Sequence, residues 1–228
     1  MKEKSSKEKM MDKVANFFQN NRTVIWIILG VIVVVMIGFI VMNQITMSTN
    51  SAALDKLNDV RENYNNWYTE SDKEKKQSIE SDILEQLTAI ISDYSNTYAA
   101  LKSLQMRADI YYANKEYETA AKDYLKIYTS FPKSDLASVA MYNQAICYEE
   151  LKEYAKANDL FAKVMEKYPE SAEAPKSAYA VCRILVKQEE NSLADEYFTK
   201  IEDKYASSDW QKIAQNLRIE LKAKGLIQ

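Results

Sequence analysis

The side chains that could carry chemistry in this chain are two cysteines and many carboxylates, because histidine is absent from all 228 residues. Without histidine there is no Ser-His-Asp or Cys-His arrangement, and the commonest metal ligand is missing. Two pairs of adjacent carboxylates, Glu149 with Glu150 and Glu189 with Glu190, could in principle serve glycoside hydrolysis. No pattern holds either pair in a dry pocket. We therefore expect a solvated acidic face, no enzyme activity, no cofactor and no metal site, with a carboxylate-dependent envelope hydrolase as the less favoured alternative.

The chain contains only three glycines and three prolines. Gly30 and Gly38 lie in one apolar run and Gly225 lies near the end, which excludes a glycine-rich phosphate loop. So few Gly and Pro residues, with abundant Ala, Leu, Lys, Glu and Gln, predict an all-α fold. Residues 23–228 carry 24 basic and 30 acidic groups, and this negative balance would repel nucleic acid.

Residues Val24 to Met42 form an uninterrupted apolar run, VIWIILGVIVVVMIGFIVM. As a helix this run would be about 28 Å long, close to the ~30 Å hydrocarbon core of a bilayer. We therefore predict a single transmembrane helix at residues 23–42. The run is longer than the apolar region of a signal peptide, and no small-x-small cleavage site follows it. An uncleaved signal anchor is thus favoured over a cleaved signal peptide.

The charged residues on either side of the run predict its orientation. The basic residues of the first 22 positions are Lys2, Lys4, Lys7, Lys9, Lys13 and Arg22. After the run, the first basic residue is Lys56. The more basic side of a span stays in the cytoplasm. Residues 1–22 should then be a cytoplasmic basic tail at a bacterial inner membrane, and the larger C-terminal part should be periplasmic.

The basic tail also contains apolar residues at helical spacing. These are Met10, Met11, Val14, Phe17 and Phe18. Residues 9–20 could form an amphipathic helix in the headgroup region of the membrane. A continuous extension of the membrane helix is the other interpretation, and the sequence leaves both open.

The rest of the chain repeats with a period of 37 residues. The segments FPKS at 131–134, YPES at 168–171 and YASS at 205–208 start 37 residues apart, and another step back reaches Tyr94. Thr97, Ser134, Ser171 and Ser208 then occupy equivalent positions, and each could cap the helix that follows. Two prolines, at positions 132 and 169, are expected to end the preceding helices.

Small and aromatic residues recur at fixed places within this period. The first two sets are Ala108, Tyr111, Ala120, Tyr124 and Pro132, then Ala145, Tyr148, Ala157, Phe161 and Pro169. The third set is Cys182, Leu185, Ala194 and Phe198, with Ala206 where proline would stand. Small residues mark close approach of two helices in a hairpin, and aromatic residues fill the space beside them. The pattern resembles the tetratricopeptide repeat, with the loop between repeats lengthened.

The period predicts how the chain is divided. After a linker at 43–50, residues 51–96 should form a degenerate helical hairpin that caps the array. Residues 97–208 should form three tetratricopeptide-like repeats, and residues 209–228 a C-terminal capping helix. The expected helices of the repeats are 97–113, 117–130, 136–150, 154–167, 174–189 and 192–204. Stacking of three or more hairpins buries a continuous core.

Cys147 and Cys182 fall on the first helices of successive hairpins. A disulfide is conceivable outside the cytosol. Their places within the repeat differ by two residues, and neighbouring helix axes are about 8–10 Å apart. A disulfide requires Cα atoms within about 7 Å. We therefore favour two buried free thiols, and the alternative of a bridge stays open.

The concave wall of such an array is built from the first helix of each hairpin, and it is the candidate binding surface. The side chains expected to face it are Gln105, Asp109, Tyr112, Tyr142, Asn143, Ile146, Glu149, Tyr179, Arg183 and Val186. Tyrosines with isolated polar groups suit peptide binding, because they give large contact area at modest entropy cost. The alternative is an ordinary solvated surface. No cluster of Lys and Arg is expected there, which argues against a clamp for acidic C-terminal tails.

The order of parts resembles the YfgM family of ancillary Sec-translocon subunits. It consists of a short charged tail, FFQNNRTVIWIILG leading into the span, and then helices and repeats. The resemblance implies a membrane-anchored helper that binds the translocon, envelope chaperones or emerging secreted chains. The FPKS and YPES loops are closer to the repeats of BamD and CpoB, which implies the alternative of outer-membrane or cell-wall assembly, or division. BamD is lipid-anchored and CpoB is soluble after cleavage, so neither matches an uncleaved span.

Overall fold

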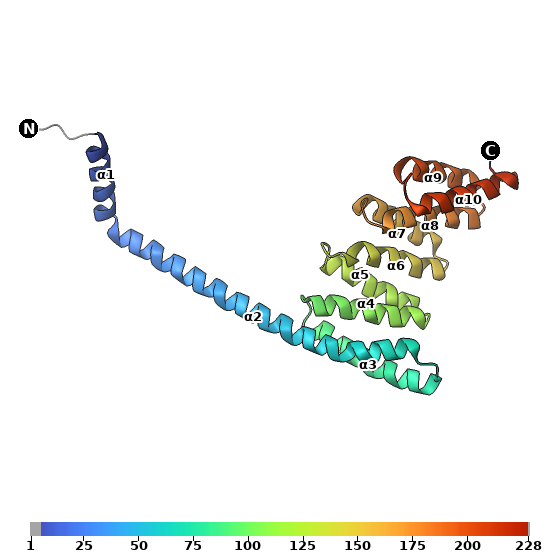
Figure 1. Ribbon diagram of the computed structural model, residues 1–228, viewed down its shortest axis with the longest axis horizontal. Coiled ribbons are helices and arrows are strands. Elements are labelled where there is room, and N and C mark those ends of the chain that lie inside the picture. Colours follow the sequence, from blue (N-terminus) through green and yellow to red (C-terminus); the bar gives the residue numbers. More distant parts are fainter. Residues whose placement is uncertain (1–5, 228) are drawn as a thin grey trace, which may run out of the picture. The chain divides into compact units, whose positions relative to one another are not determined.

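The computed structural model describes residues 6–227, so Lys2 and Lys4 of the basic tail lie outside the described residues. Helices account for all the regular structure between residues 6 and 227, and the expected all-α fold is confirmed (Figure 1). The helices are α1 (Ser6–Asn20), α2 (Arg22–Thr69), α3 (Lys73–Asp93), α4 (Tyr98–Ala113), α5 (Tyr117–Ser130), α6 (Leu136–Glu150), α7 (Tyr154–Lys167), α8 (Glu173–Lys187), α9 (Asn191–Lys204) and α10 (Asp209–Ala223).

The chain divides into two compact units, residues 1–52 and residues 53–228. In the first unit, α2 carries the apolar run and is long and apolar enough to cross a membrane. None of the apolar window is buried within the protein. Helix α1 ends at Asn20 and α2 begins at Arg22, so the membrane helix is interrupted at Asn21 rather than extended to the N-terminal side.

The linker expected at residues 43–50 is helical and belongs to α2, which corrects that boundary. The segment NQITMSTN contains neither glycine nor proline, so nothing breaks its hydrogen-bond ladder. The one side chain that competes for a backbone carbonyl, Thr46, donates to Met42 at 2.9 Å without ending the helix.

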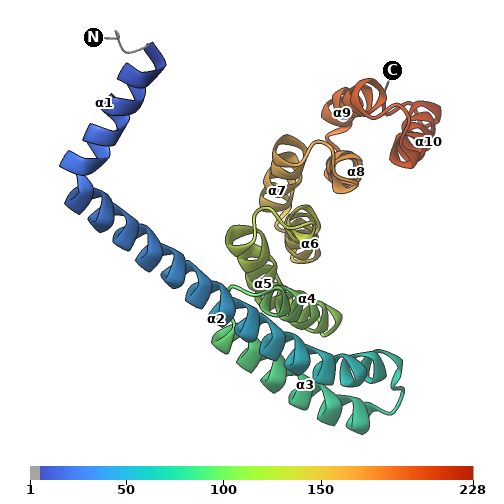
Figure 2. The same cartoon turned by 60° about the vertical axis from the view of Figure 1, so that its left-hand side comes forward.

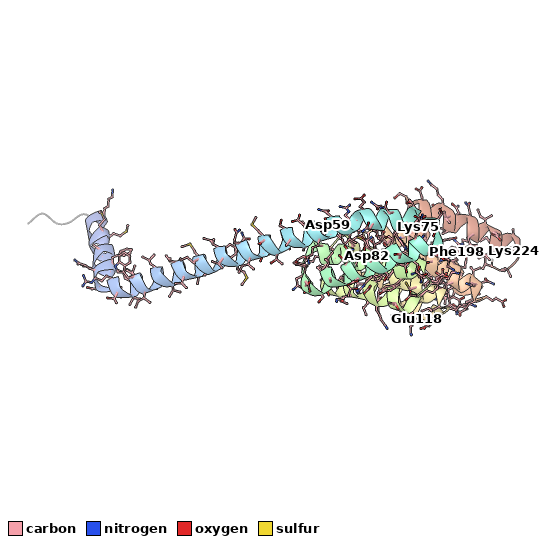
Figure 3. All side chains as sticks on the ribbon, turned by 90° about the horizontal axis from the view of Figure 1, so that it is seen from below. Asp59, Lys75, Asp82, Glu118, Phe198 and Lys224 are labelled. Carbon is pink, nitrogen blue, oxygen red and sulfur yellow. The ribbon has the colours of Figure 1, made fainter. Side chains whose placement is uncertain are left out.

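In the second unit, the hairpins α4–α5, α6–α7 and α8–α9 stack in chain order, with α3 against α4 and α10 against α8 and α9. The first helices, α4, α6 and α8, lie along one side of the stack, and the second helices lie along the other (Figure 2). A continuous apolar core runs through these hairpins. Phe198 is 1% exposed inside it, whereas charged residues such as Glu118 project from the surface (Figure 3).

The loop between hairpins begins each time with an aromatic residue in the same conformation. Tyr94, Phe131, Tyr168 and Tyr205 have φ of −127°, −126°, −130° and −127°. Each backbone N–H donates to the carbonyl four residues earlier. Tyr205 adopts this conformation although Ala206 follows it, so proline is not required to end the helix. The helix end that recurs every 37 residues is therefore also present at the end of α3, although the hairpin of α2 and α3 lacks the other residues of the pattern.

Inside each hairpin the turn contains a residue with left-handed backbone. Lys115, Lys152 and Glu189 have φ of 64°, 61° and 63°, and they stand 37 residues apart. The N–H of the following residue donates across the turn to the carbonyl five residues before it, as between Glu153 and Tyr148 at 2.8 Å. This bond is the one that closes a helix C-terminus in a Schellman motif. It sets the direction of the second helix without a glycine.

The expected caps are present at the two ends of the array and absent within it. Thr97 and Ser208 accept from the N–H groups of Ala100 and Gln211 at 3.2 and 3.1 Å. Ser134 and Ser171 do not cap, because the residues that precede α6 and α8 are already in αR conformation. Their buried hydroxyls have no hydrogen-bond partner within residues 6–227. A side-chain cap needs extended backbone at the capping residue, and the tighter internal turns do not provide it.

Replacing Thr97 with alanine is expected to lower the free energy of unfolding by about 1 kcal/mol, because Ala100 N–H loses its acceptor. Ser134→Ala should leave that free energy unchanged or raise it slightly, since its buried hydroxyl has no hydrogen bond to lose. Urea unfolding of the full chain in detergent, followed by far-UV circular dichroism, measures both. Equal losses for the two variants would contradict the difference between terminal and internal loops.

Candidate functional site

The residues expected to pack the hairpins lie mostly in the core. The six small residues Ala108, Ala120, Ala145, Ala157, Cys182 and Ala194 are each 0% exposed. Tyr124, Phe161 and Phe198 are buried beside them. Tyr111 and Tyr148 are half-buried and pack against the same core. Pro132 and Pro169 are exposed, so their place is in the loop and not in the helix contact.

The ten residues expected on the concave wall come from three adjacent first helices. Helix α4 supplies Gln105, Asp109 and Tyr112, helix α6 supplies Tyr142, Asn143, Ile146 and Glu149, and helix α8 supplies Tyr179, Arg183 and Val186. Glu149 is buried, Arg183 is exposed, and the others are half-buried. We call this surface the first-helix groove.

Half of these residues meet in one pocket between α4 and α6, with a volume of about 320 Å³. The lining residues are Asp109, Tyr112, Tyr124, Tyr142, Asn143 and Ile146. Gln105 lies outside it, where it accepts from Lys102 Nζ at 2.7 Å. The three residues of α8 also lie outside it. The structure thus divides the residues expected on the concave wall between this pocket and its flanks.

Asp109 is held at the pocket by Tyr124, whose hydroxyl donates to Asp109 Oδ1 at 2.7 Å. Burial raises the pKa of Asp109, and the hydrogen bond from Tyr124 opposes this effect without cancelling it. Phe161 and Phe198 occupy the position of Tyr124 in the next two repeats, and Ile146 replaces Asp109 in the second. This hydrogen bond therefore belongs to the first repeat alone.

A charged pair connects α6 to α8 beside the pocket. Arg183 Nη2 donates to Glu149 Oε2 at 2.7 Å. The Glu149 side chain is 9% exposed and that of Arg183 is 45% exposed, so the pair lies at the edge of the groove. Burial raises the pKa of Glu149, and the charge of Arg183 counteracts it. Because Arg183 is already paired, it is not a free anion-binding group.

Aromatic contacts hold the tyrosines of the groove in place. The ring centroids of Tyr112 and Tyr117 are 5.3 Å apart, and those of Tyr142 and Phe161 are 5.4 Å apart. Burial and the nearby charge of Glu150 raise the pKa of Tyr112 to about 12, so its hydroxyl stays protonated. Such rings present rigid faces with a polar edge, which suits recognition of polypeptides.

Three residues near the groove were not among the expected site residues. Tyr124 was expected only as a packing residue, and the signal for its role is a tyrosine where the other repeats have phenylalanine. Trp210, at the start of α10, lies 5.6 Å from Tyr179 between ring centroids. Tyr64 lies in the part of α2 without the repeat pattern, and burial together with the charge of Asp109 raises its pKa. No sequence signal marks Tyr64 or Trp210.

Cys147 and Cys182 are free, and both are 0% exposed. Burial raises the pKa of each thiol to about 12. Both thiols therefore stay protonated near neutral pH, and the thiolate is the reactive form. Among the described residues there is no group of three or more Cys, Asp or Glu side chains placed to hold a metal ion.

Iodoacetamide is expected to leave both cysteines unmodified in the folded chain at pH 8 and to alkylate both after denaturation. Because the pKa of each folded thiol is about 12, almost none of it is thiolate at pH 8. An exposed thiol, with an ordinary pKa of about 8.5, would be partly thiolate at that pH. Mass spectrometry of the intact chain counts the alkyl groups. Rapid alkylation of the folded chain at pH 8 would contradict the buried positions.

Comparison with known proteins agrees with this geometry. A family model described as Tetratricopeptide repeat matches residues 102–134 and 139–171, which include most of the first two hairpins. No curated protein matches the chain. The crystal structure of the apo form of RapI is similar with a TM-score of 0.54 and 20% sequence identity. The match covers 73% of this chain and 48% of RapI, so this chain spans about half the length of RapI.

The second unit therefore has a tetratricopeptide-like arrangement of helices in which two repeats match the family model, and such repeats suggest a scaffold for protein–protein interaction. At this level of identity, the likeness to RapI concerns the helical-repeat fold alone. The apolar helix at the N-terminal side adds a segment long enough to cross a membrane.

Proposed function

We propose that this protein is a non-enzymatic scaffold, anchored in the bacterial inner membrane, that binds segments of other polypeptides in the first-helix groove. The observation that carries this proposal is the pocket between α4 and α6. It combines three tyrosines with a carboxylate and an amide on a tetratricopeptide array. Side chains of an extended segment could enter the pocket while its backbone follows α6 and α8.

The orientation of the array is the second part of the proposal. The excess of basic residues before the span supports a cytoplasmic tail and a periplasmic array. Protease added to intact spheroplasts should then degrade residues 53–228 and leave a fragment that contains α1 and the apolar part of α2. Protection of the array until the membrane is permeabilised would overturn this orientation.

We further propose that the array assists the Sec translocon or envelope chaperones with secreted proteins. The support is the order of parts that resembles YfgM-type subunits. Cross-linking in intact cells, followed by purification under denaturing conditions and mass spectrometry, tests this assignment. Translocon subunits, chaperones or secreted chains are the expected partners. Recovery of outer-membrane assembly, cell-wall or division proteins without any of these would favour the alternative assembly role.

A further inference from the structure

The pocket between α4 and α6 has the chemistry of a site for a cation. Three tyrosines line it, together with the carboxylate of Asp109 and the amide of Asn143. A ring face attracts a cation, and a carboxylate pairs with it. We infer that the pocket takes the ammonium or guanidinium group of a Lys or Arg side chain in the bound polypeptide. This inference rests on the proposed function and specifies its partner.

The charges around the pocket favour this occupant. On its flanks, Arg183 pairs with Glu149, and Lys102 donates to the neutral amide of Gln105 while its charge still acts on Asp109. The residues that line the pocket include an acidic side chain and no basic one. The charges of Glu150 and Glu149 also act on Tyr112, whose ring lies in this pocket. A cation entering the pocket therefore meets the carboxylate of Asp109, which forms no ion pair among the described residues, and displaces none.

Other occupants would be less well accommodated. An acidic side chain would meet the carboxylate of Asp109 in a partly buried site, where like charges repel strongly. An apolar side chain would cover Asp109 and Asn143 without replacing their bonds to water, which costs free energy. A basic side chain supplies donors to both groups, and its methylene stem packs on Ile146 and the tyrosine rings.

Two substitutions can move the carboxylate of the pocket from α4 to α6. The Tyr124 hydroxyl donates to Asp109 and is within hydrogen-bonding reach of the Asn143 side chain. In a double variant with Asp109→Asn and Asn143→Asp, the hydroxyl can still donate to a carboxylate, which now stands on α6 instead of α4. Charge and shape are thus kept while the position of the negative group changes.

The test is selection of random dodecapeptides, displayed on phage, against the full chain in nanodiscs of zwitterionic phosphatidylcholine, with empty nanodiscs for counter-selection. Selected peptides should share a Lys or Arg at one position. Replacing that residue with Gln in a synthetic peptide should weaken binding about tenfold, the loss expected for one cation site of roughly 1.4 kcal/mol. Asp109→Asn should produce the same loss, and the double variant should recover most of it.

Asp209→Asn provides the matched control, because this carboxylate is 90% exposed on α10 and should leave the affinity unchanged. Thermal unfolding of each variant shows whether the array remains folded. The cation site is overturned if the selected peptides share no basic position. It is also overturned if Asp109→Asn binds the basic peptide as well as the wild type does while Tyr142→Ala does not. In both cases the proposed peptide binding in the groove stands. Selection of no peptide would overturn both.

Discussion

Replacing Phe161 with alanine is expected to lower the free energy of unfolding of the array by about 3–5 kcal/mol. Phe161 is 0% exposed in the middle hairpin, and its ring packs against Tyr142 at 5.4 Å between centroids. Truncation removes buried apolar surface and leaves a cavity that the surrounding helices can fill only in part. Urea unfolding of the full chain in detergent measures the loss.

Tyr98→Ala is the matched control for this substitution. Tyr98 is also aromatic and helical, but it is 60% exposed at the start of α4, so its removal should change the unfolding free energy little. A loss below about 1 kcal/mol for Phe161→Ala would contradict the position of this ring in a close-packed core. Because Phe161 supports Tyr142, the variant should also weaken peptide binding in the groove.

Replacing Asp123 with alanine is expected to destabilise the array by about 3 kcal/mol. Asp123 accepts from Arg107 Nε and Nη2 at 2.7 Å each, and the two side chains are 9% and 15% exposed. Arg107 Nη1 also donates to Thr88 at 2.8 Å, so this group joins α3, α4 and α5. Removal of the carboxylate leaves a largely buried guanidinium without its counter-charge.

Asp159→Ala provides the comparison for this ion pair. Asp159 pairs with Lys163 at 2.6 Å within α7, but its side chain is 60% exposed, and such surface pairs contribute little. Unfolding in urea should therefore separate the two variants clearly. A destabilisation by Asp123→Ala no larger than that by Asp159→Ala would show that the Arg107 pair does not hold α4 to α5 in the first hairpin.

The 37-residue period predicts the repeat helices because the residues that start, end and pair these helices recur at the same places in each period. Helices α5, α6 and α7 have the expected boundaries, since small and aromatic residues fix where paired helices touch. Arg107 and Arg218 are three periods apart, and both donate to a threonine on the preceding second helix, Thr88 and Thr199. The repeat geometry thus extends to α3 and α10, beyond the three hairpins that the sequence pattern marks.

The features that the sequence did not predict depend on backbone conformation and on contacts between distant residues. Whether Ser134 caps a helix is decided by the αR conformation of the next residue, and the residue type does not reveal it. The linker expected at 43–50 is helical although its Asn, Ser and Thr residues have only modest helix propensity, because no glycine or proline interrupts the segment. Tyr64 reaches Asp109 across a separation in sequence that no pattern of spacing records.

Site-specific photo-cross-linking in living cells tests the central claim most directly. A photoreactive phenylalanine replaces Tyr142 or Tyr179 in the first-helix groove, or Lys122 or Lys163, which are exposed on the second helices. We expect polypeptide adducts from the two groove positions and far weaker adducts from the other two. Equal yields from both faces, or adducts from the second helices alone, would contradict binding in the groove.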